Sequence, residues 1–154
     1  MTPTLRAALD AAGVAYELLA HDVTYHSAEE GAAAFGVDLA QMAPTLVLRT
    51  EQGAMVATVS GTTRLSLRKL KKALRLRNVS LAAPEEVRAL TGADPGPVPL
   101  VNPGLATLVD RRLLEQPWAY GGCGVPARTL KLRPADLVSM TGARVLDIAE
   151  EKPA

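Results

Sequence analysis

Cysteine, histidine and aromatic residues are scarce in this sequence, and each scarcity excludes a class of structure. Cys123 is the single cysteine of the 154 residues, so no disulfide can form within the chain. His21 and His26 are the only histidines and could supply at most two metal ligands, so we expect neither a metal nor another cofactor. One Phe, one Trp and three Tyr leave most of the 48% hydrophobic content to Ala, Val and Leu. This predicts an aliphatic core in one domain over residues 1–154.

Long apolar runs are also missing. No run approaches the roughly 20 apolar residues that are needed to span a bilayer. Residues 1–10 include Arg6 and Asp10 and contain no long apolar stretch, which is not the pattern of a signal peptide. We therefore expect a cytoplasmic protein with no membrane partner.

Charge is nearly balanced over the whole chain but not along it. The segment 64–77 (RLSLRKLKKALRLR) holds seven basic residues and no acidic one, which leaves ten basic against sixteen acidic residues elsewhere. Such a segment either neutralises the phosphates of a nucleic acid or forms the solvated face of an amphipathic helix. No aromatic residue interrupts the run, so base stacking is not expected there.

Turn signals and periodicity predict short helices and strands in irregular alternation. Thr2 caps a first helix that Gly13 ends, and Ser27 opens a capping box for a second helix through Phe35. The clearest element is a β-hairpin over 45–61. Further helices are expected over the basic segment, 84–91 and 134–141, and further strands over 15–21, 106–110, 119–122, 129–133 and 143–148. This mixture predicts an α+β fold.

A loop dense in proline and glycine, ADPGPVPLVNPGL, covers residues 93–105. Proline fixes φ, and Gly96 permits backbone conformations that other residues avoid. The loop could therefore aim backbone N–H groups at a ligand carbonyl or phosphate. A stiff surface crossing without a ligand explains the same composition, and the residues alone leave both interpretations open.

Three isolated side chains are candidates for chemistry. Cys123 lies among Gly121, Gly122 and Gly124, where it is either a nucleophile that needs a nearby base or a small packing residue. Asp110 follows the apolar run ATLV and is either a structural carboxylate at a strand end or a pocket residue. His21 ends a predicted strand and is interpreted as a structural polar residue.

In this order, the segments resemble the YbaK/ProX family of aminoacyl-tRNA deacylases, the free-standing relatives of the prolyl-tRNA synthetase editing domain. The resemblance extends from about His21 to Ile148. The matching segments are TLVL with its hairpin, LRKLKKAL, LAAPEEVRALTG, GPVP, LVD, GGCG and LKLRPADLVSMTGARVLDI. It implies a single α+β domain with a mixed, curved β-sheet surrounded by short helices.

The resemblance also implies a reaction and a set of site residues. Members of this family hydrolyse the ester that joins a wrongly attached amino acid to the 3′ end of a tRNA, with the substrate's own ribose hydroxyl helping to activate water. Gly96 and Val98 are then the catalytic positions of the loop. Substrate contacts are implied for Pro97, Pro99, Thr45, Asp110, Gly122, Cys123 and Gly124. Contacts to the tRNA backbone are implied for Arg68, Lys69, Lys71, Lys72 and Arg75.

Two positions depart from the family pattern. Pro44 stands immediately before the Thr-Leu-Val strand, where the family usually carries a Lys that holds the substrate near the reacting ester. Proline has neither the charge nor the donor of that side chain. The loop then reads Leu100-Val101-Asn102 where the family often continues with Pro, Phe and Gly.

Three functional hypotheses follow. The first is a trans-editing aminoacyl-tRNA hydrolase, whose partners are an aminoacylated tRNA and, as a further candidate, an aminoacyl-tRNA synthetase. The second is a non-catalytic homologue that binds an aminoacyl-tRNA or a nucleotide-like ligand, which Pro44 favours. The third is DNA or RNA binding through the basic segment alone, which has the least support because the rest of the chain is acidic. We predict the first.

Overall fold

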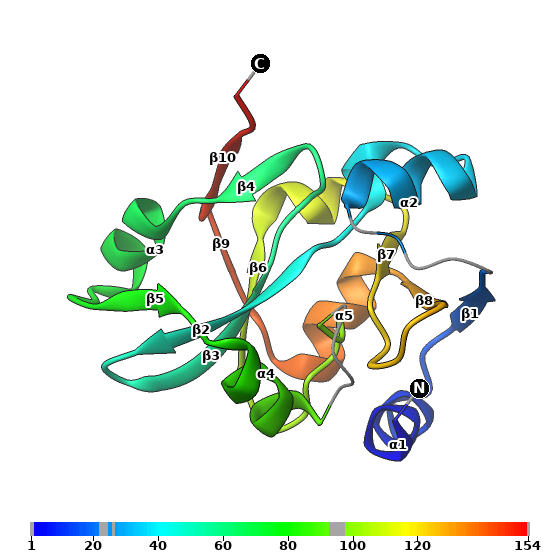
Figure 1. The fold of residues 1–154 in the computed structure, drawn as a ribbon, viewed down its shortest axis with the longest axis horizontal. Helices are drawn as coiled ribbons and strands as arrows, with labels where there is room; N and C mark the ends of the chain where they lie inside the picture. Colours follow the sequence, from blue (N-terminus) through cyan, green and yellow to red (C-terminus); the bar gives the residue numbers. More distant parts are fainter. Residues whose placement is uncertain (1, 22–24, 26, 93–97, 154) are drawn as a thin grey trace.

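A five-stranded mixed sheet forms the centre of the computed structural model, which describes residues 2–21, 25, 27–92 and 98–153 (Figure 1). Its strands, in spatial order, are β5 (Val79–Leu81), β2 (Thr45–Thr50), β3 (Gly53–Thr58), β6 (Ala106–Asp110) and β9 (Arg144–Leu146). The pairs that involve β2 are antiparallel, whereas β3 with β6 and β6 with β9 are parallel. The predicted hairpin and mixed α+β character are confirmed.

The remaining strands form two smaller sheets instead of extending the central one. β1 (Tyr16–Ala20), β8 (Arg128–Leu132) and β7 (Ala119–Gly121) make an antiparallel three-stranded sheet with β8 in the middle. β10 (Ala149–Glu151) pairs with β4 (Thr63–Leu65) in a two-stranded sheet. The strands β4, β5 and β10 were not expected. Three residues are too few to show an alternating pattern, and these strands, unlike β7 and β9, do not lie within a longer strand-like segment of the sequence.

Four of the five α-helices begin and end at the predicted signals, whereas the helix expected over the basic segment 64–77 is shorter than predicted, because Arg64 and Leu65 belong to a strand. The helices are α1 (Pro3–Ala12), α2 (Ala28–Phe35), α3 (Leu67–Leu74), α4 (Pro84–Thr91) and α5 (Pro134–Thr141), with short 3-10 helices η1 (Leu39–Gln41) and η2 (Arg111–Glu115). Thr2 Oγ1 accepts a hydrogen bond from Leu5 N, and Ser27 Oγ accepts one from Glu30 N. Helix α3 ends at Arg75, which holds a left-handed φ of 55° where the other four helices end at glycine. Within the described residues, no helix has the length and apolar character to cross a membrane.

The core is aliphatic, as expected, and lies in separate clusters. One cluster joins α1, α5 and the three-stranded sheet around Leu5, Leu9, Leu130 and Leu137. A second lies between the central sheet and α3, where Leu70 of the helix is fully buried. Leu67 and Leu74 of α3 pack against the same cluster, so the helix is amphipathic in the way the sequence predicts.

A buried carboxylate joins the C-terminal segment to the central sheet. Asp110, at the end of β6, is fully buried and accepts hydrogen bonds from Ile148 N at 2.9 Å and Ala149 N at 3.0 Å. It also accepts from Arg112 N at 3.1 Å and from the Arg112 guanidinium. Because its lone pairs are satisfied by protein donors, Asp110 serves the structure as a strand-end carboxylate.

The same network holds α3 in place. Asp147 accepts from Arg112 Nη1 at 2.9 Å and from Lys69 Nζ at 3.1 Å, and Lys69 also donates to Ala149 O at 2.8 Å. The hydrogen bonds from Arg112 first, and then from Lys69, lower the pKa of Asp147. Lys69 is thus committed to the fold, unlike its neighbours on the helix.

We expect Asp110→Ala to destabilise the protein by about 3 kcal/mol, because two buried backbone N–H groups and one guanidinium lose their acceptor together. The measurement is urea unfolding at neutral pH, with Glu115→Gln as a control that removes an exposed charge from the adjoining η2. The control should change the free energy of unfolding by less than about 0.5 kcal/mol. An equal, small effect of both substitutions would contradict the structural role of Asp110.

Candidate functional site

A cavity of about 500 Å³ lies between α2, the start of β2 and the three-stranded sheet. It brings together three residues that the sequence singled out, Thr45, Val98 and Gly122, from segments far apart in the chain. The described residues that line it are His21, Tyr25, Ser27, Ala28, Gly31, Phe35, Met42, Ala43, Pro44, Thr45, Leu46, Val98, Tyr120, Gly121, Gly122, Ala127, Arg128 and Thr129. Arg128 is the one side chain among them with a permanent charge, so the described part of the lining is largely neutral.

Strand β7 holds the two walls of this cavity together through its backbone. Ala43 N donates to Tyr120 O at 2.8 Å, and two residues further along the same edge of the chain Leu100 N donates to Gly122 O at 2.8 Å. Pro99 and Gly122 form an isolated parallel bridge, so Pro99 positions the loop although it does not itself line the cavity. The loop and the start of β2 are therefore fixed relative to each other by the strand edge to which both are bonded.

Gly121 is required by the same close approach. A Cβ atom at this position would lie 3.1 Å from Leu100 Cβ and 3.3 Å from Ala43 O. Leu100 is fully buried and has little room to yield. The glycine cluster thus serves the approach of backbone to backbone, which was one of the uses the sequence suggested.

Thr45 contributes a buried hydroxyl at the floor of the cavity. Its Oγ1 lies 2.7 Å from Thr58 Oγ1 on the partner strand and donates to Ala43 O at 3.4 Å. Thr58 is fully buried and Thr45 nearly so. The pair therefore fixes the Thr45 side chain in one orientation.

Helix α2 and a group of aromatic rings form the apolar wall. Ala28, Gly31 and Phe35 follow one another at helical spacing and line the cavity from one face of α2. The Phe35 ring stacks on Tyr120 with centroids 6.2 Å apart, and His21 lies against Tyr25 at 4.6 Å. Sequence reasoning did not assign these residues to the site, because each lies in a segment whose local pattern indicates only a helix or a strand end.

His21 is placed at the edge of the cavity by the three-stranded sheet. Its Nε2 lies 3.2 Å from Thr129 Oγ1, and both residues line the cavity. His21 was interpreted as structural, and this contact between β1 and β8 agrees with that interpretation. It also places an imidazole at the wall of the cavity.

Besides Pro99, three expected site residues lie outside this cavity, and two more lie outside the described residues. Cys123 is fully buried in the core and its Sγ donates to Arg128 O at 3.7 Å, which corresponds to the packing role. Gly124 packs against Thr2 and Pro99, and neither it nor Cys123 lines the cavity. Asp110 is occupied by the fold contacts described above and is likewise absent from the lining. Gly96 and Pro97 lie outside the described residues.

The basic helix is not part of the cavity. Figure 1 shows α3 and the three-stranded sheet toward opposite ends of the molecule. Arg68, Lys72 and Arg75 are exposed on α3, whereas Lys69 is held by Asp147. If these cations contact the same substrate as the cavity, that substrate must extend over much of the molecule.

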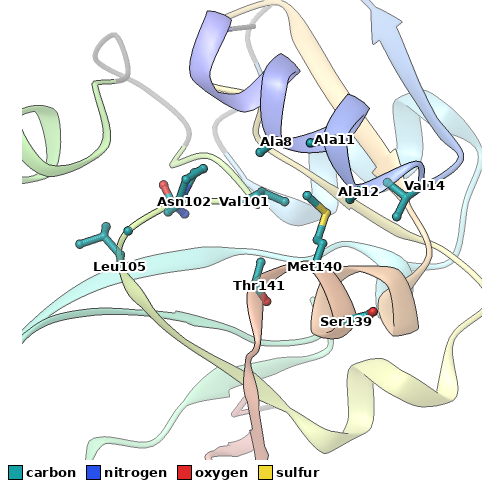
Figure 2. A pocket seen from close by; sticks show the side chains of 12 residues that line it. Ala8, Ala11, Ala12, Val14, Val101, Asn102, Leu105, Ser139, Met140 and Thr141 are labelled. Atoms are coloured by element: carbon teal, nitrogen blue, oxygen red, sulfur yellow. The ribbon is translucent and has the colours of Figure 1, made fainter.

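A second hollow of about 570 Å³ lies between α1, residues 101–105 and α5 (Figure 2). Figure 2 shows Ala8, Ala11 and Ala12 of α1 facing Met140 and Asn102. Asn102 Nδ2 donates to Pro99 O at 2.7 Å, whereas its Oδ1 is buried without a partner. The two hollows are similar in size, but this second one contains none of the predicted site residues. We therefore place the candidate site in the first cavity. Among the described residues, no group of three or more His, Cys, Asp and Glu side chains is arranged to hold a metal.

Comparison with known proteins gives a family match and close structural neighbours. The family model of the aminoacyl-tRNA editing domain matches residues 23–140. A proline–tRNA ligase of Solidesulfovibrio magneticus is 35% identical over 124 residues, which are 77% of this chain and 22% of that ligase. The crystal structure of a candidate trans-editing enzyme for prolyl tRNA synthetase has 33% identity and a TM-score of 0.82, over 97% of this chain and 99% of that one. A crystal structure of a hypothetical protein has 32% identity and a TM-score of 0.86, over 95% and 99%.

We expect Thr45→Val to cost about 1–2 kcal/mol of stability, because it leaves the buried Thr58 hydroxyl without its partner. The double variant Thr45→Val with Thr58→Val removes both hydroxyls and should regain most of that loss, since two apolar side chains of similar shape then face each other. Urea unfolding of the two single variants and the double variant measures this coupling. Losses that simply add in the double variant would show that the pair does not fix Thr45.

Proposed function

This chain belongs to the aminoacyl-tRNA editing domain family, and from that premise we propose that it hydrolyses the ester between a wrongly attached amino acid and the 3′ end of a tRNA. The observation that carries the proposal is the convergence of Thr45, Val98 and Gly122 on one largely neutral cavity. Its volume of about 500 Å³ lies within the ordinary range for small-molecule sites. An amino acid with its ester and terminal ribose is a ligand of suitable size.

The proposed reaction places few chemical demands on the protein. Water attacks the ester carbonyl carbon, the bond from that carbon to the ribose oxygen breaks, and the ribose oxygen takes up a proton. The neighbouring ribose hydroxyl of the substrate would help to activate the water. The protein then has to hold the ester in one orientation and offer donors to the developing oxyanion, for which we propose the loop that contains Gly96 and Val98.

The geometry of β7 supports this division of labour. Because backbone hydrogen bonds fix both the loop and the start of β2 to β7, the distance between Val98 and Thr45 does not depend on flexible side chains. A rigid cleft of this kind can orient an ester without a charged anchor. We therefore propose that catalysis proceeds with Pro44 in place of the usual family lysine.

The comparisons support a more specific substrate. The curated relative is a proline–tRNA ligase, and one structural neighbour is described as a trans-editing enzyme for prolyl tRNA synthetase. We propose that the substrate is a tRNA for proline that carries the wrong amino acid, and that the synthetase is a partner. Arg68, Lys71, Lys72 and Arg75 of α3 would contact the phosphates of that tRNA, whereas Lys69 stays with Asp147.

The test of this function is the hydrolysis of a panel of correctly and wrongly charged tRNAs by the purified protein. We expect turnover of one mischarged species and a loss of at least about a hundredfold in Ala28→Phe, which fills the cavity from α2. Ala33→Phe is the matched control, because it places the same ring on the exposed, opposite face of the same helix. Turnover that survives equally in both variants would show that the reaction occurs elsewhere.

The non-catalytic hypothesis makes a different prediction for the same panel. If the protein only binds, no species is hydrolysed, yet an aminoacyl-adenosine raises the temperature of unfolding of the wild type and of Ala33→Phe but not of Ala28→Phe. The observation that favours this alternative is the neutral lining beside Pro44. Hydrolysis of any member of the panel rejects it.

We expect Pro44→Lys to raise kcat/KM for the mischarged tRNA by roughly tenfold to a hundredfold, because a charged donor at the cavity wall forms stronger hydrogen bonds than a neutral one. Pro44→Met is the control, since it also removes the proline ring and has a similar length without the charge. Steady-state kinetics with the three proteins gives the comparison. Equal values for the lysine and methionine variants would show that this cavity does not use a cation at position 44.

A further inference from the structure

One face of the three-stranded sheet leads from the cavity to a partly exposed group of one aromatic and two basic side chains. Side chains alternate along a strand, so Thr129 and Lys131 of β8 point to the same face, as do Tyr120 and Trp118 at β7. The register pairs Tyr120 with Lys131, which places the two rows side by side. Thr129 and Tyr120 line the cavity, whereas Lys131 and Trp118 lie beyond its edge.

The outer end of this face is built around the indole of Trp118. Lys131 Nζ lies 4.4 Å from the ring centroid and Arg133 Cζ lies 5.0 Å from it. Lys131 Nζ is also 5.9 Å from the Tyr120 ring, so the cluster is continuous with the aromatic wall of the cavity. The Trp118 ring is half-buried and Arg133 is exposed, which leaves both open to a ligand.

This combination of groups is suited to a single-stranded nucleic acid. An aromatic ring offers a face on which a base stacks, and two adjacent cations neutralise the flanking phosphates. Stacking of a base on an aromatic ring contributes more than an exposed cation–π contact, so a base that displaces a cation from the ring is favoured. The displaced cation then remains within reach of the backbone.

Glu17 is the single acidic group that the structure shows against this cluster. Its Oε2 lies 3.8 Å from Lys131 Nζ, and its side chain is 63% exposed. The Lys131 side chain is only 20% exposed, but an ion pair of this length with an exposed carboxylate contributes little, so Glu17 does not prevent Lys131 from meeting a phosphate. The cluster remains net positive with Glu17 included.

We propose that Trp118, Lys131 and Arg133 bind the unpaired nucleotides that precede the aminoacylated 3′ nucleotide in the cavity. The inference rests on the proposed function, because the cavity has to hold the terminal ester for the chain to run in this direction. Along an extended strand Lys131 lies about 7 Å beyond Thr129, and Arg133 about 13 Å beyond it. These are the distances over which the next one or two nucleotides leave the cavity.

The basic helix α3 does not serve this purpose. It lies toward the opposite end of the molecule and carries no aromatic residue between its cations (Figure 1). Its exposed charges suit a paired, double-stranded region, whose phosphates need no stacking platform. The two basic regions would thus contact different parts of one RNA.

The first test uses the fact that Trp118 is the only tryptophan of the chain. An RNA oligonucleotide that ends in CCA and carries no amino acid should quench the intrinsic fluorescence of the protein in a saturable manner. Lys131→Ala and Arg133→Ala should each reduce the dependence of log K on log salt by about 0.7, whereas the exposed, remote Arg88→Ala should leave it unchanged. The absence of saturable quenching would overturn the proposal, whatever the protein hydrolyses.

The second test separates this surface from the cavity. With a labelled CCA oligonucleotide, Trp118→Ala should weaken binding about tenfold or more, and Trp118→Phe should retain most of it because a ring is kept. With substrates, Trp118→Ala should raise KM for the mischarged tRNA at least tenfold more than KM for the matching aminoacyl-adenosine. Equal effects on the two substrates would overturn the proposal while leaving the hydrolytic function standing. Quenching by the oligonucleotide without hydrolysis of any tRNA would support the surface and reject the function.

Discussion

The candidate site depends on the backbone contacts of β7 with two segments that are remote from it in sequence. Ala43 N donates to the carbonyl of Tyr120 in this short strand, and Leu100 N donates to the carbonyl of Gly122, the residue that follows the strand. Both carbonyls point to the same edge. Between these two bonds lies Gly121, where any side chain would press on Leu100. Three chain segments meet here without an intervening side chain, so the position of the loop relative to the start of β2 is set by backbone, while side chains of α2 and the aromatic rings complete the cavity.

The elements with local signals could be predicted from the sequence, and those defined by distant partners could not. Thr2 and Ser27 cap their helices through hydrogen bonds to residues three positions later, so a short stretch of sequence is enough to predict their roles. The strands β4, β5 and β10 are recognisable only by their pairing with a partner strand, because none of them lies within a longer segment with a strand pattern. The sequence likewise indicated that strand-forming segments were present, but not that they would divide among three sheets.

The same distinction applies to the site. Thr45, Val98 and Gly122 were expected from a family resemblance and meet in the cavity, whereas Ala28, Gly31 and Phe35 line it without any motif to mark them. Asp110 shows the reverse case. An acidic residue after an apolar strand suggests either a residue of a binding pocket or a structural carboxylate. The hydrogen bonds from Ile148 N and Ala149 N, almost forty residues later in the chain, show that Asp110 is structural. Cys123 is decided in the same way, by the core that surrounds it.

The contacts of the C-terminal segment have a consequence for the order in which the chain acquires its structure. Ile148 O accepts from Ser66 N, Asp147 pairs with Lys69, and Ile148 itself fills the cluster under α3. A ribosome that has released the first hundred residues has therefore supplied α3 and part of the cluster it packs on, but not Leu108 and Ile148, which complete that cluster, nor Asp147, which pairs with Lys69. Contacts of such high sequence separation slow folding, and they leave the apolar face of α3 incompletely covered until synthesis is almost finished. During translation this face is consequently open to contacts with other apolar surfaces.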